Sequence, residues 1–227
     1  NKRNVVITVV INENVAKNLD EFNKLLLPKR YLKISYATKE KNVYIEGYIE
    51  SFEYDHFSNK VKCQISVMCP KPYWRAQDAE TAKLSPVVDL FEFPFSIPKE
   101  GIAFSEYIGS MSEYFTNPGN VETGVMIDIE ATKKVKNPLI VNATTGQQIK
   151  LLIVINEGDH ITINTERGDK SIILERNGEK TNVLNTLDDT SEWLRLAPGS
   201  NRINYNADSG ADNMLITIKC PILYGGV

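Results

Sequence analysis

Two histidines and several acidic residues are the side chains that could bind a metal or carry out acid–base catalysis. His56 and His160 are far apart in the chain, each within strand-like sequence, and neither has a second histidine at the spacing of a zinc site. The sequence contains no glycine-rich phosphate-binding loop and no nucleophile elbow. We therefore expect both histidines on solvent-facing strands, and we predict no catalytic, cofactor or metal site.

An acidic cluster, Asp188, Asp189 and Glu192, directly precedes Trp193. Paired carboxylates serve glycoside hydrolysis, and clustered ones bind calcium. No further carboxylate stands opposite this cluster at a defined spacing. A turn capped by Asp189 or Thr190 is the simpler interpretation.

The tripeptide Arg167-Gly168-Asp169 matches a known cell-adhesion motif. Gly-Asp is also typical of a tight hairpin, and apolar strand residues lie on both sides, at Ile163 and Ile172. We interpret the tripeptide as a turn.

The three cysteines do not form a disulfide framework. Cys63 and Cys69 lie on one alternating strand, where six residues correspond to about 20 Å, too far for a disulfide. Cys220 leaves an odd count. We predict buried free thiols and a reducing place of synthesis.

Composition excludes several classes of protein. The 227 residues are 42% hydrophobic and 24% charged with a net charge of −3, as in ordinary globular proteins. No apolar run approaches the roughly 20 residues of a membrane helix, and no signal peptide precedes the first strand-like segment. Lys133, Lys134 and Lys136 are the only basic run, too short for a nucleic-acid surface. We expect a soluble protein without nucleic-acid contact or membrane insertion.

Residues 1–82 are predicted to form a small α+β domain. Apolar residues recur with the helical period over 15–26, Asn12 or Asn14 can cap the start, and Pro28 ends the run. The predicted strands are 5–11, 31–37, 43–54 and 61–69. The domain closes near Tyr73 and Trp74, and the polar, Ala-rich stretch 75–85 is expected to be a linker or a short helix.

Residues 83–227 are predicted to form an antiparallel β-sandwich, because short strands and turns alternate throughout. The expected strands are 90–95, 125–131, 139–142, 148–155, 160–165, 171–175, 181–184, 202–206 and 213–219. Asn177-Gly178 is the strongest hairpin signal. Trp193 and Tyr205 are candidate aromatics for stacking on sugar rings, with burial in the core as the simpler expectation for each.

Several phrases occur in a fixed order along the whole chain. They are Tyr44-Ile45-x-Gly47-Tyr48-Ile49, Val67-Met68-Cys69-Pro70-Lys71-Pro72-Tyr73-Trp74, Asn117-Pro118-Gly119-Asn120, Pro138-Leu139-Ile140-Val141-Asn142, Ser191-Glu192-Trp193-Leu194-x-Leu196-x-Pro198-Gly199-x-Asn201 and Ile222-Leu223-Tyr224-Gly225-Gly226-Val227. In this order they resemble the distal tail proteins of siphoviruses, phages with long non-contractile tails, that infect Gram-positive hosts.

The resemblance implies a mainly β, non-enzymatic structural hub of a phage or prophage tail. Residues 1–82 would be the belt domain of a hexameric ring, and residues 83–227 a galectin-like β-sandwich. The implied partners are the tail tube protein, the tape-measure protein and the tail-associated fibre or lysin hub. The implied location is the virion tail tip, after synthesis in the host cytoplasm.

Two details concern the first domain. Family members usually carry a further N-terminal strand region, so we expect this chain to lack that part. Tyr73 and Trp74, at the expected domain junction, are candidates for fixing the two domains together or contacting a neighbouring subunit, with burial within one chain as an equal alternative.

The alternative function is a carbohydrate-binding module for host cell-wall glycans. Sugar-binding galectins use an H-x-N-x-R phrase, but here Thr162 and Asn164 follow His160 at those offsets. Their W-x-x-E-x-R phrase fails as well, since Leu196 and Pro198 follow Trp193. We therefore favour a scaffold over a lectin. A wall hydrolase is disfavoured, because neither a carboxylate pair nor a zinc set is present.

Overall fold

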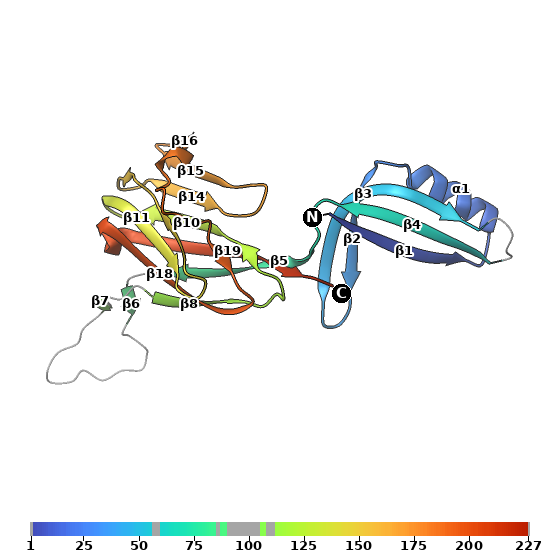
Figure 1. Cartoon of the computed structure of the whole chain (residues 1–227), viewed down its shortest axis with the longest axis horizontal. Coiled ribbons are helices and arrows are strands. Elements are labelled where there is room, and N and C mark those ends of the chain that lie inside the picture. The colour runs from blue at the N-terminus through green and yellow to red at the C-terminus, as the bar shows by residue number, and fades with distance from the viewer. Residues whose placement is uncertain (1, 56–59, 85–86, 90–104, 108–111, 227) are drawn as a thin grey trace. The chain divides into compact units, whose positions relative to one another are not determined.

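The computed structural model describes residues 2–55, 60–84, 87–89, 105–107 and 112–226 (Figure 1). The chain forms two compact units: unit 1 is Asn1–Gln77 with Leu223–Val227, and unit 2 is Asp78–Ile222. The division thus falls after residue 77, where the sequence predicted residue 82, and the last five residues belong to unit 1. His56 and the predicted strand 90–95 lie outside the described residues.

Unit 1 is an antiparallel sheet with one helix. Its elements are β1 (Arg3–Ile11), α1 (Val15–Leu25), β2 (Tyr31–Ala37), β3 (Asn42–Tyr54), β4 (Val61–Cys69) and the start of β5 (Trp74–Leu84). The strands follow the order β1-β4-β3, and both β2 and β5 also pair with β3 (Figure 1). The predicted helix and the three-strand meander are confirmed.

The helix packs on one face of this sheet. Val15, Leu19 and Phe22 recur on one side of α1 and contact a buried cluster. The cluster consists of Ile11, Val61 and Cys63. The expected cap is wrong in its detail, because Asn14 occupies the N-cap position with φ 46° but its side chain makes no capping hydrogen bond.

The opposite face of the unit 1 sheet is exposed. On β1, Val6 and Val10 are each 50% exposed. Val5, Ile7 and Val9 point to the other face and pack against the core. On β3 the alternation of a strand places Tyr44, Glu46 and Tyr48 on this exposed face. This face carries the candidate site described below.

Unit 2 is a β-sandwich. One sheet has the order β19-β10-β14-β15-β16, built from β19 (Met214–Tyr224), β10 (Met126–Ala131), β14 (His160–Asn164), β15 (Ser171–Arg176) and β16 (Glu179–Asn182). The other has the order β12-β11-β18-β8, built from β12 (Gln147–Lys150), β11 (Val135–Asn142), β18 (Gly199–Ser209) and β8 (Ser112–Asn117), with β13 (Val154–Ile155) also on β11. The short pairs are β9 (Thr123–Gly124) with β17 (Arg195–Leu196) and β6 (Val87–Asp89) with β7 (Ser105–Tyr107).

Rows of isoleucine across neighbouring strands set the register of the first sheet. One row is Ile218, Ile127, Ile163 and Ile172, and every side chain in it is at most 1% exposed. β-Branched side chains suit a pleated, buried surface. A slip by one residue would turn the whole row toward solvent, so burial of these residues specifies the pairing.

Several local predictions are confirmed. Asn177 and Gly178 both have positive φ, 53° and 80°, and join β15 to β16 as a tight hairpin. All three cysteines are buried, and none of them forms a disulfide. Gly168 has φ 90°, and the amide of Asp169 donates to the carbonyl of Glu166, so the adhesion-like tripeptide is a turn.

The stretch 75–85 contradicts its prediction. It is neither a linker nor a helix, because Trp74–Leu84 is strand β5, whose start pairs with β3 through Ala76 opposite Val43 and Arg75 opposite Tyr44. The polar, Ala-rich segment has no alternation that would indicate a strand. Backbone pairing with its neighbours in the sheet, β3 and β19, favours the extended conformation.

Candidate functional site

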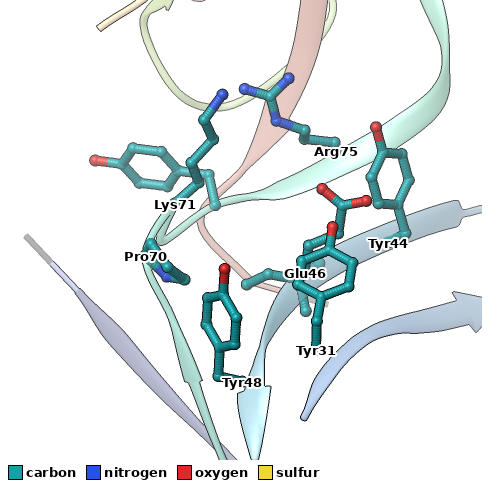
Figure 2. Close-up of a pocket in the computed structure, with 9 residues that line it drawn as sticks. Tyr31, Tyr44, Glu46, Tyr48, Pro70, Lys71 and Arg75 are labelled. Carbon is teal, nitrogen blue, oxygen red and sulfur yellow. The ribbon is translucent and has the colours of Figure 1, made fainter. Parts of the chain in front are cut away.

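A pocket lined by tyrosines opens on the exposed face of the unit 1 sheet (Figure 2). We call it the tyrosine pocket; its volume is about 170 Å³. Its lining includes Tyr31, Tyr44, Tyr48 and Tyr73, together with Ile45, Glu46, Pro70, Lys71 and Arg75. Strands β2 and β3 supply one wall, and the segment that joins β4 to β5 supplies the other.

Tyr31 and Tyr48 form the aromatic wall of the tyrosine pocket. They are directly opposite each other on β2 and β3, and their ring centroids lie 5.6 Å apart in an edge-to-face arrangement. Figure 2 shows the two phenol groups standing on adjacent strands and pointing the same way. Their side chains remain 54% and 47% exposed, so the rings present open surface to a ligand.

Charged groups surround these rings. The Tyr31 hydroxyl donates a hydrogen bond to the Glu46 carboxylate, which raises the pKa of Tyr31 above its ordinary value. The Lys33 ammonium lies 3.7 Å from the ring centroid of Tyr44, a cation–π contact. Lys71 and Arg75 add two cations to the lining against the single carboxylate of Glu46. The site combines open aromatic surface with charged side chains of both signs.

The neighbouring residues Tyr73 and Trp74 have different environments. Trp74 is 5% exposed, belongs to the core of unit 1, and has an edge-to-face contact with Tyr36 at 6.4 Å. Tyr73 is 41% exposed and lines the tyrosine pocket. The alternation of side chains at the start of β5 separates them.

Sequence reasoning named Tyr73 but none of the other pocket tyrosines as site residues. A signal for two of them was present, because Tyr44 and Tyr48 are large aromatics on the side of the predicted strand 43–54 that should face solvent. Tyr31 has the same signal on the predicted strand 31–37, where it lies on the side opposite Leu32 and Ile34. Its place beside Tyr48 follows from the register between β2 and β3.

The two candidate sugar-binding aromatics lie in unit 2. Tyr205 is 4% exposed and belongs to the sandwich core, which leaves little ring surface for stacking. Trp193 is partly buried against the same core, and the Lys170 ammonium lies 4.9 Å from the centroid of its ring system. Of the two residues, only Trp193 presents ring surface.

We expect lactose to bind the chain weakly or not at all. Stacking on Trp193 alone contributes about 1 kcal/mol, and the polar residues of the galectin phrases are missing. Titration of lactose into the full chain by calorimetry checks this. Binding in the micromolar range that is lost in Trp193→Ala would contradict it.

The acidic cluster near Trp193 caps a turn, as expected, but through a different residue. Asp188, and neither Asp189 nor Thr190, accepts the capping hydrogen bonds, from the amide of Thr190 at 2.9 Å and from its hydroxyl at 2.5 Å. These bonds lower the pKa of Asp188. Within the described ranges, no three His, Cys, Asp or Glu side chains are grouped as a metal site would require.

His160 is exposed on β14 and lies between Glu130 and Glu175 of the neighbouring strands. This confirms the solvent-facing strand position predicted for it. None of the helices in the part of the chain that the structure describes is long and apolar enough to cross a membrane.

Buried asparagines explain the phrase that ends at Pro198-Gly199-x-Asn201. The Asn201 amide group donates to the carbonyls of Ala197 and Gly199 at 2.8 and 3.0 Å, and its oxygen accepts from the Ala197 amide at 3.0 Å. The Asn142 amide group donates to the same oxygen at 3.1 Å and to the carbonyl of Arg195 at 2.8 Å. This phrase therefore has a structural role: it holds an irregular segment beside β18.

The chain resembles known proteins in the sequence of one segment and in its fold. Residues 118–219 match the family described as siphovirus-type tail component, C-terminal domain. Residues 118–219 are therefore a siphovirus-type tail-component domain. No curated protein matches it.

Solved structures share the fold of the chain. The crystal structure of the Dit (gp 19.1) protein of phage SPP1 superposes with a TM-score of 0.65 at 12% identity, covering 97% of this chain and 78% of that one. A chain of the phage P2 baseplate, in its activated conformation with calcium, gives 0.51 at 13% identity, covering 99% and 80%.

The family match of residues 118–219 indicates a structural, non-enzymatic role in the virion tail. The predicted mainly β fold with a sandwich is confirmed as well. The tyrosine pocket lies outside the matched residues 118–219, so the family match assigns nothing to it.

Proposed function

We propose that this tail component is the distal hub of a siphovirus that infects Gram-positive bacteria, and that six copies form a ring through unit 1. The hub joins the tail tube protein to the baseplate and its fibre or lysin hub, with the tape-measure protein in the bore. Synthesis takes place in the host cytoplasm, in keeping with three cysteines that form no disulfide. The family match of residues 118–219 carries the proposal.

Strand β1 supports ring formation. Among the described residues β1 pairs with β4 alone, so its other edge presents unpaired backbone groups. From Asn4 to Ile11 the strand has neither a charge nor a proline, and it is rich in β-branched residues. Natural proteins rarely leave such an edge open, because it templates aggregation. A neighbouring subunit that covers β1 resolves this, and repeating the contact around an axis closes a ring.

Tyr73 and Trp74 keep distinct roles in this proposal. Trp74, buried in unit 1, stabilises the start of β5. Tyr73, half-exposed, is available for contact with another protein. The sandwich of unit 2 is the part presented to the adsorption apparatus, and a glycan-binding role for it is tested by the lactose titration above.

We expect Val6→Lys combined with Val10→Lys to abolish the ring. Both side chains are half-exposed on the open face of β1, so lysine is tolerated in one subunit. Lysine on an edge strand opposes pairing of that edge with another chain. Light scattering across a concentration series should show about six times the monomer mass for the parent chain and the monomer mass for the double variant. The matched control is Val154→Lys in unit 2, where the side chain is 38% exposed.

The assembly experiment has one outcome that contradicts the proposal. A parent chain that stays monomeric at every concentration, both alone and with tail tube protein, would show that unit 1 does not form a ring.

A further inference from the structure

The tip of the β15–β16 hairpin in unit 2 holds two residues that can react with each other (Figure 1). Asn177-Gly178 is the only Asn-Gly pair in the sequence, and every other asparagine is followed by a residue with a side chain. Glycine has no Cβ, so its backbone nitrogen can closely approach the side-chain amide carbon of Asn177. The pair combines an accessible nucleophile with an electrophilic carbon.

Neither group of this pair is engaged elsewhere. Asn177 and Gly178 are exposed and, apart from the adjoining residues, no heavy atom lies within 4 Å of the place where a Cβ of Gly178 would stand. In the part of the chain that the structure describes, neither the Gly178 amide nor the Asn177 side chain makes a hydrogen bond to another residue. The side-chain amides of Asn142 and Asn201, by contrast, are buried and hydrogen-bonded.

The hairpin that holds the pair opens at little cost. Among the described residues β16 pairs with β15 alone, and all four residues of β16 are exposed. Asn177 has φ 53°, a left-handed conformation that costs free energy for a residue with a Cβ. Segments with few buried contacts open locally at a free energy far below that of global unfolding. Opening frees the dihedral angles between the two groups, so that the nitrogen can reach the carbon.

We propose that Asn177 deamidates spontaneously, through attack by the backbone nitrogen of Gly178. A bond forms between this nitrogen and Cγ of Asn177, and the side-chain nitrogen leaves as ammonia together with the proton of the Gly178 amide. Water then opens the resulting cyclic imide at either of its carbonyls. One opening gives aspartate, and the other gives isoaspartate, in which the backbone runs through the side chain. The reaction needs only water, and it is independent of the hub proposal because every reacting group of the protein belongs to one subunit.

The two products have different effects on the hairpin. Aspartate leaves the backbone unchanged, and Asp-Gly suits the same two-residue turn as Asn-Gly. Isoaspartate adds one backbone carbon to the loop. Because loop length fixes the register of a hairpin, the pairing of Arg176 with Glu179 is lost and β16 separates from β15. The reaction thereby turns β15 into an open edge of the sheet.

Peptide mapping by mass spectrometry tests the site in the full chain. The protein is incubated in mildly alkaline and in mildly acidic buffer, and a gain of one mass unit is followed over time in the peptides that contain Asn177 and Asn206. Asn206 is the internal control, because it is exposed as well but is followed by Ala207. Asn177 should react first, and faster in the alkaline buffer, since the attacking nitrogen reacts after losing its proton.

A synthetic peptide with the sequence of residues 175–180, blocked at both ends, gives the rate of the reaction without the fold. Asn177 in the folded chain should react within about thirtyfold of the peptide, the factor that corresponds to an opening free energy of about 2 kcal/mol. A slower reaction in the folded chain would overturn the inference, as would a mass gain at Asn206 as fast as that at Asn177.

Hydrogen exchange tests the effect on the hairpin. The amides of β16 should exchange faster in the aged protein, in proportion to the isoaspartate that an isoaspartate-specific methyltransferase detects. In the variant Asn177→Asp they should exchange as in the fresh parent chain. Exchange of β16 that stays unchanged as isoaspartate accumulates would overturn the predicted separation from β15. The mass of the assembly, measured alongside, reports on the ring separately.

Discussion

Asn201→Ala should lower the free energy of unfolding of unit 2 by about 3 kcal/mol, since each buried group that loses its hydrogen bond costs about 1–3 kcal/mol. The Asn201 side chain is fully buried and makes hydrogen bonds to the backbone of Ala197 and Gly199 and to the side chain of Asn142. Alanine removes hydrogen bonds from the partly buried backbone of Ala197 and from the buried side chain of Asn142. Denaturant unfolding, followed by fluorescence of Trp193 in a Trp74→Phe background, measures the change.

Asn206→Ala is the matched control on the same strand. Asn206 is exposed, and its side chain accepts a hydrogen bond from the adjacent Ala207 amide at 2.8 Å. Its substitution should change stability by no more than about 0.5 kcal/mol. If Asn201→Ala costs no more than this control, the buried amide network does not hold the Pro198-Gly199 segment.

Asp159→Asn should have an effect of similar size, because it breaks a buried ion pair. The carboxylate of Asp159, in a residue 3% exposed, receives hydrogen bonds from Nε of Arg176 at 3.0 Å, from a terminal nitrogen of Arg176 at 2.6 Å and from the amide of Asn156 at 2.8 Å. Removing one partner of a buried pair costs about 3–5 kcal/mol. We expect about 3 kcal/mol, at the lower end because the Arg176 side chain is 42% exposed.

The Asp159 pair should also make the stability of unit 2 depend on pH. The Arg176 guanidinium lowers the pKa of Asp159 below its ordinary value. The folded state therefore binds the proton less readily than the unfolded state, whose aspartate pKa is about 3.9. The stabilisation is complete above that value and is lost as the pH falls through the lower pKa of the folded state.

Unfolding curves between neutral and strongly acidic pH measure this dependence. The stability difference between the parent chain and Asp159→Asn should narrow in acid. Glu175→Gln, which affects an exposed pair with Lys180 at 3.4 Å, is the control and should change stability by less than about 1 kcal/mol at any pH. A difference that stays constant down to the lowest pH would show that the charge of Asp159 contributes nothing.

Local patterns predicted most of the elements. The helical period of residues 15–26 gave α1, which ends at Leu25, and the alternation around Ile127, Ile161 and Ile172 gave the central strands of the sandwich. These patterns suffice because a strand or helix with one apolar face has only one way to bury it. The Asn177-Gly178 turn could be predicted from these two residues alone, since both tolerate positive φ.

The predictions that failed concerned features that depend on contacts between segments far apart in the sequence. Nothing in the polar stretch 75–85 indicates a strand, because pairing with β3 supplies hydrogen bonds that no local pattern records. From the sequence, the phrase around Asn201 was interpreted only as a turn and as one of the motifs that resemble the tail-protein family. Its buried amide network joins residues that are up to 59 positions apart, Asn142 and Asn201.

By itself, the sequence determined most of the strands, the helix, the Asn177-Gly178 turn, the buried thiols and the likeness to a tail component, because each depends on neighbours along the chain or on the order of phrases. Only the tertiary structure decided that Tyr31, Tyr48 and Tyr73 surround one cavity and that Trp74 is buried in the core. These positions follow from the register of β2 on β3 and from the path of the β4–β5 connection. Register is a property of two strands together, so no single segment of sequence contains it.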